Sequence, residues 1–255
     1  MKISIITVSY NSSSTIRQTM ESVLSQSYPD VEYIVVDGAS RDGTREIIAS
    51  YEPLFQGRMR WISESDNGIY DAMNKGLTMA GGEVVGFLNS DDYYPSPSVL
   101  EKVMETLADP MIDAVFSDLE FVSGKNGAVI RFWKGSLYRP GAFAKGWHPA
   151  HPTFFVKKAL YEKHGGFDTR FNISADFELM LRFIEKEKIS TSYIPDTLVS
   201  MRYGGESTRS LSNIWEGNKN IKKAFEKNGI KIHFLLYFIS RMVQKIKQFK
   251  QEEIA

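Results

Sequence analysis

Two adjacent carboxylates end an apolar run near the middle of the first half of the chain. Gly86-Phe87-Leu88 leads directly into Asn89, Ser90, Asp91 and Asp92. Neighbouring anions repel each other, and neither is suited to an apolar core. At the end of a strand such carboxylates can hold a hard divalent cation, which in turn can hold a phosphate. The motif therefore predicts a site for a metal-bound phosphate group.

Acidic residues also follow earlier apolar runs. Asp37 comes directly after the run 32–36, and Glu64 and Asp66 come just after the run 60–63. Asp37, Asp42 and Asp66 could instead be turn formers, since Asp-Gly and Asn-Gly pairs are common in turns. Acidic residues follow several successive strands. This repetition favours the interpretation in which the carboxylates converge on one site.

The elements that must position these residues alternate between strands and helices. We expect strands over 3–8, 32–36, 60–63 and 83–88. We expect helices over 15–25, from the turn 38–44 through 49, and from the segment 64–68 through 79. This alternation with short connections predicts an α/β fold, a Rossmann-like and mostly parallel sheet flanked by helices on both faces. In such sheets ligands bind outside the carboxyl ends of the strands, where the acidic residues fall.

The pattern is looser in the second half. A helix over 97–107 and strands over 113–122 and 129–133 are expected, followed by an irregular loop, 135–153, over the site. Further helices are expected over 157–164 and 175–187, and a strand over 191–193.

Composition excludes several classes of protein. Among 255 residues, Lys+Arg and Asp+Glu both total 31, which gives no indication of a nucleic-acid partner. The absence of cysteine excludes disulfides, thiolate catalysis and a Cys-ligated zinc site. Met1-Lys2 runs directly into strand-like sequence, so we expect no signal peptide and a cytoplasmic setting.

A nucleoside diphosphate fits the acidic strand ends if its parts are held separately. One carboxylate can accept from a base N–H, another can accept from ribose hydroxyls, and a metal can neutralise the diphosphate. A dinucleotide-binding turn is not expected, because residues 9–13 after the first run contain no glycine. A P-loop is excluded, because no Gly-x-x-x-x-Gly-Lys-Ser/Thr motif occurs.

Four motifs in this order resemble those of family 2 glycosyltransferases with the GT-A fold. The resemblance covers about residues 1–203 and implies inverting transfer of a sugar from a nucleotide-sugar donor, often a UDP-sugar, with a divalent metal, Mn²⁺ or Mg²⁺. The motifs are Thr7-Val8-Ser9-Tyr10-Asn11, Asp37-Gly38-Ala39-Ser40-Arg41-Asp42-Gly43-Thr44, Asp66-Asn67-Gly68 and Asn89-Ser90-Asp91-Asp92.

The resemblance assigns roles by position. Asp37 would contact the base, Asp66 and Lys75 would lie near the nucleoside and phosphates, and Asp91 would bind the metal. Asn89 replaces the first acid of the family's DxD motif; it can hydrogen-bond ribose but is a poorer metal ligand. Lys75 could equally belong to a solvated helix face. The rest of the nucleotide-binding set is Thr7, Ser9, Tyr10, Ser90 and Asp92.

The second half should supply the catalytic base. The segment 173–182 is similar to the family's catalytic-acid segment, with Asp176 at the position of the Asp of its Glu-Asp pair and Ala175 in place of the Glu. Asp176 should take the proton of the acceptor hydroxyl. Glu178 and Asp168 are the other candidates for the base. Ser174, Asp176 and Glu178 could instead only cap and polarise the start of a helix.

Histidines and aromatic residues of the 135–153 loop are further candidates. His151 resembles a family histidine that could touch the diphosphate or the acceptor, although it could be a local hydrogen-bonding residue, and His148 is a weaker candidate. Trp133 and Trp147 could be sugar platforms or core residues. Arg182 and Arg202 are interpreted as ordinary surface arginines.

The tail is basic and amphipathic. Apolar residues recur at helical spacing from Ile232 to Phe249, which suits a helix lying on an anionic membrane surface. Packing on the catalytic domain or on a second subunit of a homo-oligomer are the alternatives. Between 219 and 250 one acid, Glu226, stands against nine basic residues: Lys219, Lys222, Lys223, Lys227, Lys231, Arg241, Lys245, Lys247 and Lys250.

We therefore expect a GT-A catalytic domain over 1–210 and a helical tail over 211–255. Residues 1–95 would form the nucleotide-binding half and 96–210 the acceptor half. The expected protein is a peripheral enzyme at the inner face of the membrane that adds a single sugar to a lipid-linked or growing glycan acceptor. Single transfer is expected because the Gln-x-x-Arg-Trp motif of processive synthases is absent. A non-catalytic nucleotide-sugar sensor or scaffold on the same fold is the alternative.

Overall fold

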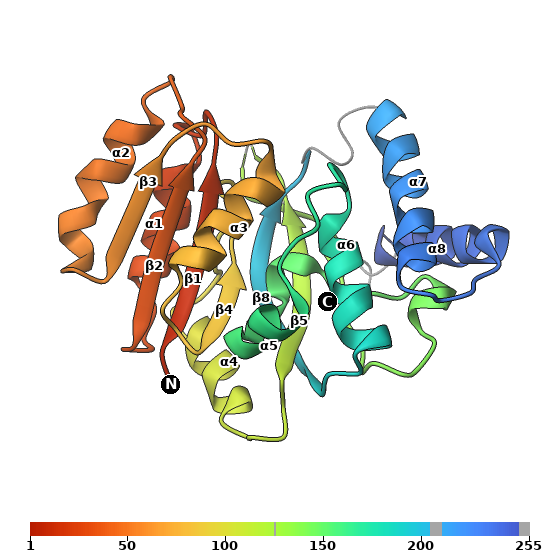
Figure 1. Ribbon diagram of the computed structural model, residues 1–255. Helices are drawn as coiled ribbons and strands as arrows, with labels where there is room; N and C mark the ends of the chain where they lie inside the picture. Colours follow the sequence, from red (N-terminus) through yellow and green to blue (C-terminus); the bar gives the residue numbers. More distant parts are fainter. Residues whose placement is uncertain (125, 205–210, 250–255) are drawn as a thin grey trace.

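Eight strands form one mixed sheet at the centre of the computed structural model, which describes residues 1–124, 126–204 and 211–249 (Figure 1). The order is β3-β2-β1-β4-β7-β5-β6, and β8 also pairs with β5. The strands are β1 (Ile3–Ser9), β2 (Val31–Asp37), β3 (Met59–Ser63), β4 (Val84–Phe87), β5 (Ala114–Val122), β6 (Val129–Trp133), β7 (Phe155–Lys157) and β8 (Thr191–Arg202).

The sheet order changes direction between β1 and β4. From β1 the chain builds outward to β2 and β3, then returns to add β4 on the other side of β1. All three pairings within β1 to β4 are parallel. The carboxyl ends of these strands therefore lie along one edge, with a switch point between β1 and β4 where ligands bind in open α/β sheets.

Helices cover both faces of the sheet, because alternating side chains along each strand point into two separate hydrophobic cores. In β1, Ile3 and Ile5 pack with α1, α2 and α4, whereas Ile6 packs on the opposite face with α3, α5 and α6. The helices are α1 (Ile16–Leu24), α2 (Thr44–Tyr51), α3 (Ile69–Met79), α4 (Val99–Leu107), α5 (Lys158–His164), α6 (Ala175–Met180), α7 (Leu211–Lys227) and α8 (Phe234–Phe249).

The predicted α/β fold class is confirmed, with three local differences. The short antiparallel strand β7 between β4 and β5 was not predicted, because three residues are too few for a periodic pattern. Strand β8 continues well past Tyr193, with a shift in register near Pro195 and Asp196 that hides its pattern. The helix expected over 175–187 is α6 followed by a π-helical segment, Leu181–Lys186.

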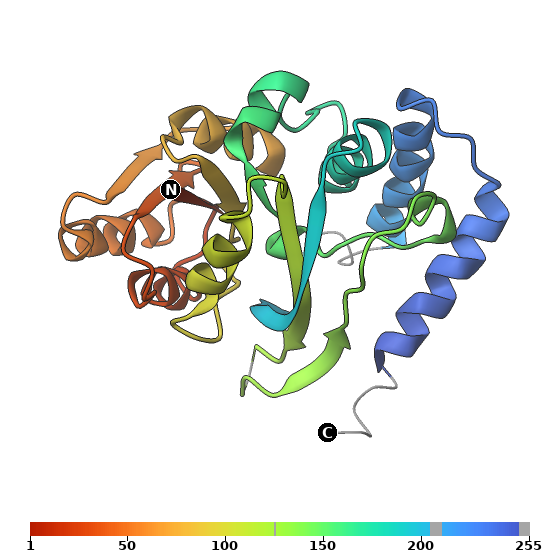
Figure 2. The same ribbon diagram turned by 90° about the horizontal axis from the view of Figure 1, so that it is seen from below.

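The C-terminal helices share the core on one face of the sheet. Phe225 of α7 and Tyr237 of α8 pack against Phe177 of α6, with ring centroids 5.6 and 6.5 Å apart. Seen from below, α8 runs along one side of the molecule, beside the loop that follows β6 (Figure 2). The expected boundary at residue 210 falls outside the described residues. In the described part of the chain, no helix has the length and apolar character needed to cross a bilayer.

Candidate active site

Asp37 joins the ends of the first three strands. Its carboxylate is completely buried and accepts hydrogen bonds from the hydroxyls of Ser9, at the end of β1, and Ser63, at the end of β3, over 3.2 and 2.6 Å. Ser40 adds its backbone N–H at 2.9 Å and its hydroxyl. These donors compensate for the cost of burying the carboxylate. Asp37 thus organises the edge of the sheet on which a base would rest.

Tyr10 and Asp66 lie on either side of Gly38. A methyl group added at Gly38 would lie 2.6 Å from Asp66 Oδ2 and 3.3 Å from the Tyr10 ring. Any larger side chain at position 38 would therefore displace the Asp66 carboxylate. The Tyr10 side chain is 67% exposed, so its ring faces solvent above the edge of the sheet. The three residues come from three strand ends and form one wall of the candidate nucleoside pocket.

Lys75 belongs to the same region. Its ammonium group lies 2.8 Å from Glu64 Oε1 and donates to the Ser65 carbonyl over 2.9 Å. The Glu64 hydrogen bond raises the pKa of Lys75 and keeps it charged. Lys75 is therefore held beside the loop that carries Asp66, with part of its charge already neutralised.

The end of β4 is tied to the end of β1. The hydroxyls of Ser12 and Ser90 lie 2.8 Å apart, which links the Asn89–Asp92 motif to the first loop across the switch point. Asn89 Oδ1 is buried and accepts no hydrogen bond within the described part of the chain. Loss of solvent raises the pKa of Asp91, and the charge of Arg202 opposes that rise. An amide oxygen and a carboxylate are therefore both available at this position.

Two of the residues predicted to contact the nucleotide are buried in this structure. Asp92 is completely buried. Its carboxylate accepts hydrogen bonds from Asn89 Nδ2 and from the Arg202 backbone N–H, over 3.2 Å each. Asp92 therefore holds Asn89 and β8 in position. Burial, together with the charge of Asp91, raises the pKa of Asp92 well above its usual range. Thr7 is also completely buried, because it faces the core and accepts from the Tyr33 hydroxyl over 3.0 Å.

Asp176 lies in the first turn of α6 and is held by a residue from the other half of the domain. The Tyr70 hydroxyl, from α3, donates to Asp176 Oδ1 over 3.0 Å. Burial and the neighbouring carboxylate raise the pKa of Tyr70, so its hydroxyl stays protonated. Tyr70 did not stand out in the sequence, because a tyrosine beside a helix start has no distinguishing pattern.

The other two acids considered as the base are already engaged. Glu178 is completely buried and lies 2.8 Å from Lys227 Nζ and 3.2 Å from Arg182 Nε. Asp168 pairs with Arg170 and Lys227, both at 2.7 Å. Arg182 is buried and donates to the carbonyls of 164–166, so its interpretation as a surface arginine was wrong. Asp176 is left as the half-exposed acid of this segment.

His148 and His151 lie close to Asp176. Burial lowers the pKa of His151, and the charge of Asp176 opposes that effect. Burial also lowers the pKa of His148, to about 4, so both rings are neutral at neutral pH. His151 is only 8% exposed and packs against Phe87 and Phe167, so aromatic packing accounts for much of its surroundings.

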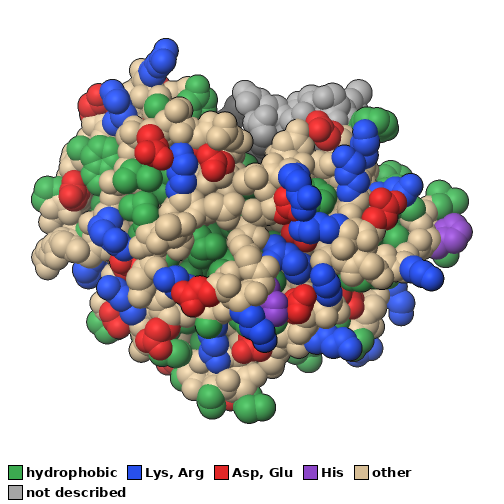
Figure 3. Space-filling model, viewed as in Figure 1, with side chains coloured by type: hydrophobic (Ala, Val, Ile, Leu, Met, Phe, Trp, Pro, Cys, Tyr) green, Lys and Arg blue, Asp and Glu red, His purple; other side chains and the backbone are tan. Residues whose placement is uncertain are grey.

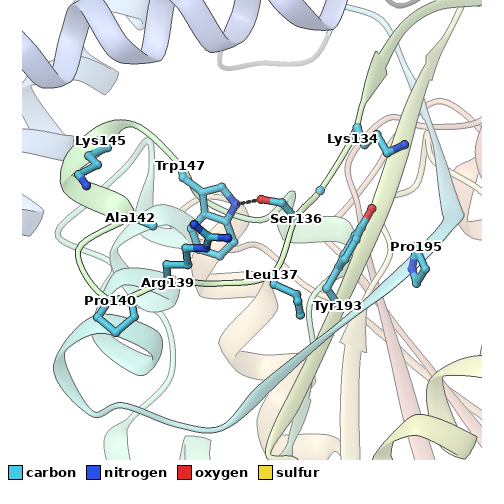
Figure 4. A pocket seen from close by; sticks show the side chains of 11 residues that line it. Lys134, Ser136, Leu137, Arg139, Pro140, Ala142, Lys145, Trp147, Tyr193 and Pro195 are labelled. Carbon is cyan, nitrogen blue, oxygen red and sulfur yellow. Dashed lines mark hydrogen bonds between the residues drawn. The ribbon is translucent and has the colours of Figure 1, made fainter.

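The two loop tryptophans have different surroundings. Trp133 packs against Phe121 and His148, with centroids 6.5 and 5.1 Å away. Trp147 donates to the Ser136 hydroxyl over 3.0 Å and lines a mainly apolar pocket of about 750 Å³, together with Leu137 and Tyr193 (Figure 4). None of the expected nucleotide-binding residues lines this pocket, so it is separate from the sheet edge.

Charges of both signs are interspersed on the face of the molecule seen in Figure 3. In the described part of the chain, no group of three or more His, Asp or Glu residues is arranged to hold a metal ion.

The model of glycosyl transferase family 2 matches residues 4–185. The chain belongs to this family. A curated family 2 relative from Mycobacterium tuberculosis, an uncharacterized glycosyltransferase, is 32% identical over 190 residues, which cover 71% of this chain and 68% of the relative. A Bacillus subtilis glycosyltransferase whose name refers to teichuronic acid biosynthesis is 43% identical over 103 residues, 40% of each chain. The expectation of a transferase enzyme is thus confirmed.

Solved structures show that this family 2 glycosyltransferase has the expected fold. Residues 1–349 of Staphylococcus aureus TarS, in complex with UDP, align with a TM-score of 0.67 at 21% identity and cover 88% of this chain, which spans 65% of theirs. The mannosyltransferase PcManGT of Pyrobaculum calidifontis, in complex with GDP-Man and Mn²⁺, aligns with a TM-score of 0.61 at 19% identity, over 98% of this chain and 82% of its own.

Proposed function

We propose that this family 2 glycosyltransferase transfers a single sugar, with inversion, from a UDP-sugar to a lipid-linked or growing glycan acceptor. The observation that carries the proposal is the placement of Asp176 at the start of α6, held by Tyr70, while Glu178 and Asp168 are neutralised in ion pairs. The UDP complex of TarS and the teichuronic acid relative support the donor and a role in polysaccharide synthesis.

We assign nucleoside binding to the first half of the domain and proton transfer to the second half. Tyr10, Gly38 and Asp66 would receive the nucleoside at the ends of the first three strands. Asp176 would take the proton of the acceptor hydroxyl while the oxygen of that hydroxyl bonds to the anomeric carbon. The bond between that carbon and the diphosphate breaks at the same time, and UDP leaves with the bonding electrons.

The donor set fits a divalent cation at the end of β4. Asp91 and the unpartnered Oδ1 of Asn89 would supply hard oxygen ligands, and the donor diphosphate and water would complete the shell. When bound, the cation would neutralise charge on the departing diphosphate. Asp91→Asn should remove the effect of Mn²⁺ on UDP affinity, and Asn89→Asp should increase it; calorimetry with and without Mn²⁺ measures both.

Hydrolysis of UDP-sugars by the purified protein tests the proposed activity. Asp176→Asn should lower the rate about 1,000-fold and leave UDP affinity unchanged, because it removes a proton acceptor and keeps the shape of the side chain. A rate that survives in the variant would assign the proton transfer to another group. If UDP-, GDP- and dTDP-sugars all fail to bind with or without Mn²⁺, the proposed function fails.

A sensor or scaffold remains the second candidate because of Ala175 and Asn89. Ala175 is completely buried, so the position of the family's Glu contributes only packing here. Donor binding without any hydrolysis or transfer would favour this candidate. Single transfer is supported by the absence of the Gln-x-x-Arg-Trp motif of processive synthases from the sequence.

We place the enzyme at the cytoplasmic face of the membrane, where donor nucleotides and lipid-linked acceptors meet. The support is the exposed apolar side of α8 together with the basic composition of the tail. Cell fractionation with and without a high-salt wash tests this localisation, and recovery in the soluble fraction at low salt would contradict it.

A further inference from the structure

The loop that leads into α6 contains a residue with an uncommon backbone conformation. Ser174, which directly precedes the helix, has a φ of 71° and a ψ of 23°. Residues other than glycine rarely adopt this left-handed conformation, and they keep it only where the surrounding structure holds it. Asp176 follows two positions later, so the conformation of the loop sets the direction in which its carboxylate points.

Helix α7 holds this loop through hydrogen bonds. The Asn220 side chain is 4% exposed, and its Nδ2 donates to the Ile173 carbonyl over 2.9 Å and to Asn172 Oδ1 over 3.1 Å. Asn172 in turn donates to Glu216 Oε1 over 2.9 Å, one turn earlier on α7. The Ile173 carbonyl belongs to the peptide group that joins Ile173 to Ser174. Asn220 therefore fixes the peptide group directly before the left-handed residue.

Further contacts join α7 to the chain before and after Asp176. A methyl group added at Gly217 would lie 3.5 Å from Ile173 Cγ2, so this turn of α7 faces the loop directly. At the other end of α7, Lys227 Nζ lies 2.8 Å from Glu178 Oε1. The two contacts precede and follow Asp176 in the sequence. The position of its carboxylate therefore depends on how α7 packs.

Tyr70 holds Asp176 from the other side of α6. In Figure 1, α3, which carries Tyr70, lies on one side of α6 and α7 lies on the other. The Tyr70 hydroxyl is 3.0 Å from Asp176 Oδ1. A displacement of about 0.6 Å would bring these atoms to about 3.6 Å, where no hydrogen bond remains. The contact with Tyr70 therefore requires that the loop before α6 keeps its place.

We propose that Asn220 is a positioning residue for the base, Asp176. By holding the Ile173 carbonyl, Asn220 keeps the loop in the conformation that directs the Asp176 carboxylate toward Tyr70 and the acceptor hydroxyl. Asn220 acts through the loop and does not contact the reacting atoms. This inference rests on the proposed glycosyl transfer, and it gives a part in catalysis to α7, which lies outside the segment 4–185 that matches the family model.

Kinetics of UDP-sugar hydrolysis by the full chain test the proposal. Asn220→Ala should lower kcat about 10-fold and change the donor KM less than about 2-fold, because the base is misdirected while the nucleoside pocket stays intact. The matched control is Asn228→Ala, since Asn228 is also buried and its Nδ2 donates to Glu178 Oε1 and to the Ala224 carbonyl over 3.1 and 2.9 Å. The control should lower Tm by a similar amount but change kcat less than about 2-fold. An equal loss of kcat in both variants would overturn the positioning role.

Amide hydrogen exchange gives a readout that does not depend on activity. The amides of 172–176 should exchange at least about 5-fold faster in Asn220→Ala than in the wild type, because the loop loses its anchor; in Asn228→Ala they should change less than about 2-fold. Equal exchange in Asn220→Ala and the wild type would overturn the proposal.

A second variant covers the case in which Asn220→Ala does not fold. Asn172→Ala, at an exposed position, removes the bonds to Asn220 and Glu216 and should lower kcat about 3-fold. Unchanged kcat in that variant would overturn the proposal. UDP affinity is measured on every variant. If the wild type hydrolyses no UDP-sugar, the proposed function fails, and the exchange of 172–176 still decides whether Asn220 holds the loop.

Discussion

The hydroxyl of Tyr70 donates a hydrogen bond to Asp176 Oδ1 over 3.0 Å, although the two residues are 106 positions apart. Tyr70 follows the Asp66-Asn67-Gly68 turn of the nucleotide half, whereas Asp176 begins α6 in the acceptor half. Stacking of Tyr70 on Phe167, with centroids 5.6 Å apart, fixes the direction of its hydroxyl. The bond thus couples the two halves through the proposed base.

Tyr70→Phe should lower kcat about 10-fold and leave the KM for the donor nearly unchanged, because a positioning hydrogen bond is lost while the nucleoside pocket stays intact. Steady-state kinetics measures both constants. Tyr28→Phe, which removes a hydroxyl bonded to the Met1 carbonyl far from the site, is the control. An equal rise in the donor KM would show that Tyr70 supports the nucleotide pocket instead.

Glu178→Gln should lower the free energy of unfolding by about 3 kcal/mol or more, because it leaves Arg182 and Lys227 without their buried partner. Asp176→Asn should change the same quantity by less than about 1 kcal/mol, since Asp176 is half-exposed. Urea denaturation measures both variants. Similar losses in the two variants would contradict the structural role that we assign to Glu178.

Gly38→Ala should weaken UDP binding at least about 10-fold, because its methyl group would displace the Asp66 carboxylate, 2.6 Å away. The overall fold should persist, since the carboxylate can move toward solvent. Gly124→Ala, whose methyl group meets no atom within 4 Å, is the matched control. Unchanged UDP affinity in Gly38→Ala would remove Asp66 and Tyr10 from the nucleoside pocket.

His148 should make the protein less stable in acid. Burial, and secondly Arg241, lowers its pKa to about 4, whereas the ring titrates near 6.5 when unfolded. The unfolded chain therefore binds the extra proton between these values, and stability falls as the pH decreases from about 6.5 to 4. In the wild type, His148 should account for a loss of free energy of unfolding on the order of 2 kcal/mol over this pH range. His148→Gln should not show this loss. Urea denaturation at successive pH values measures the difference.

The control for this measurement is His233→Gln, because His233 is exposed. Its dependence of stability on pH should match that of the wild type. If His148→Gln also follows the wild type, the ring is protonated as readily in the folded chain as in the unfolded one, and its burial has no effect on acid stability.

Much of the nucleotide half could be predicted from the sequence because its patterns are local. Buried strands such as 3–8 and 32–36 are rich in β-branched and aromatic residues, and each is followed by polar residues at the edge of the sheet. The acceptor half was harder, because β7 is short and the register of β8 shifts near Pro195. Arg182 was misread as a surface residue, because its carbonyl partners are distant in the sequence from it.

The sequence by itself determined the fold class and the order of the strand-end motifs, since both depend on residue type and near-neighbour spacing. Only the tertiary structure decided which acids face the site. Asp92 and Glu178 are buried while Asp176 is half-exposed, although all three look alike in the sequence. The pairing of Tyr70 with Asp176 also required it. A contact across more than 100 residues depends on how layers pack, which no local pattern records.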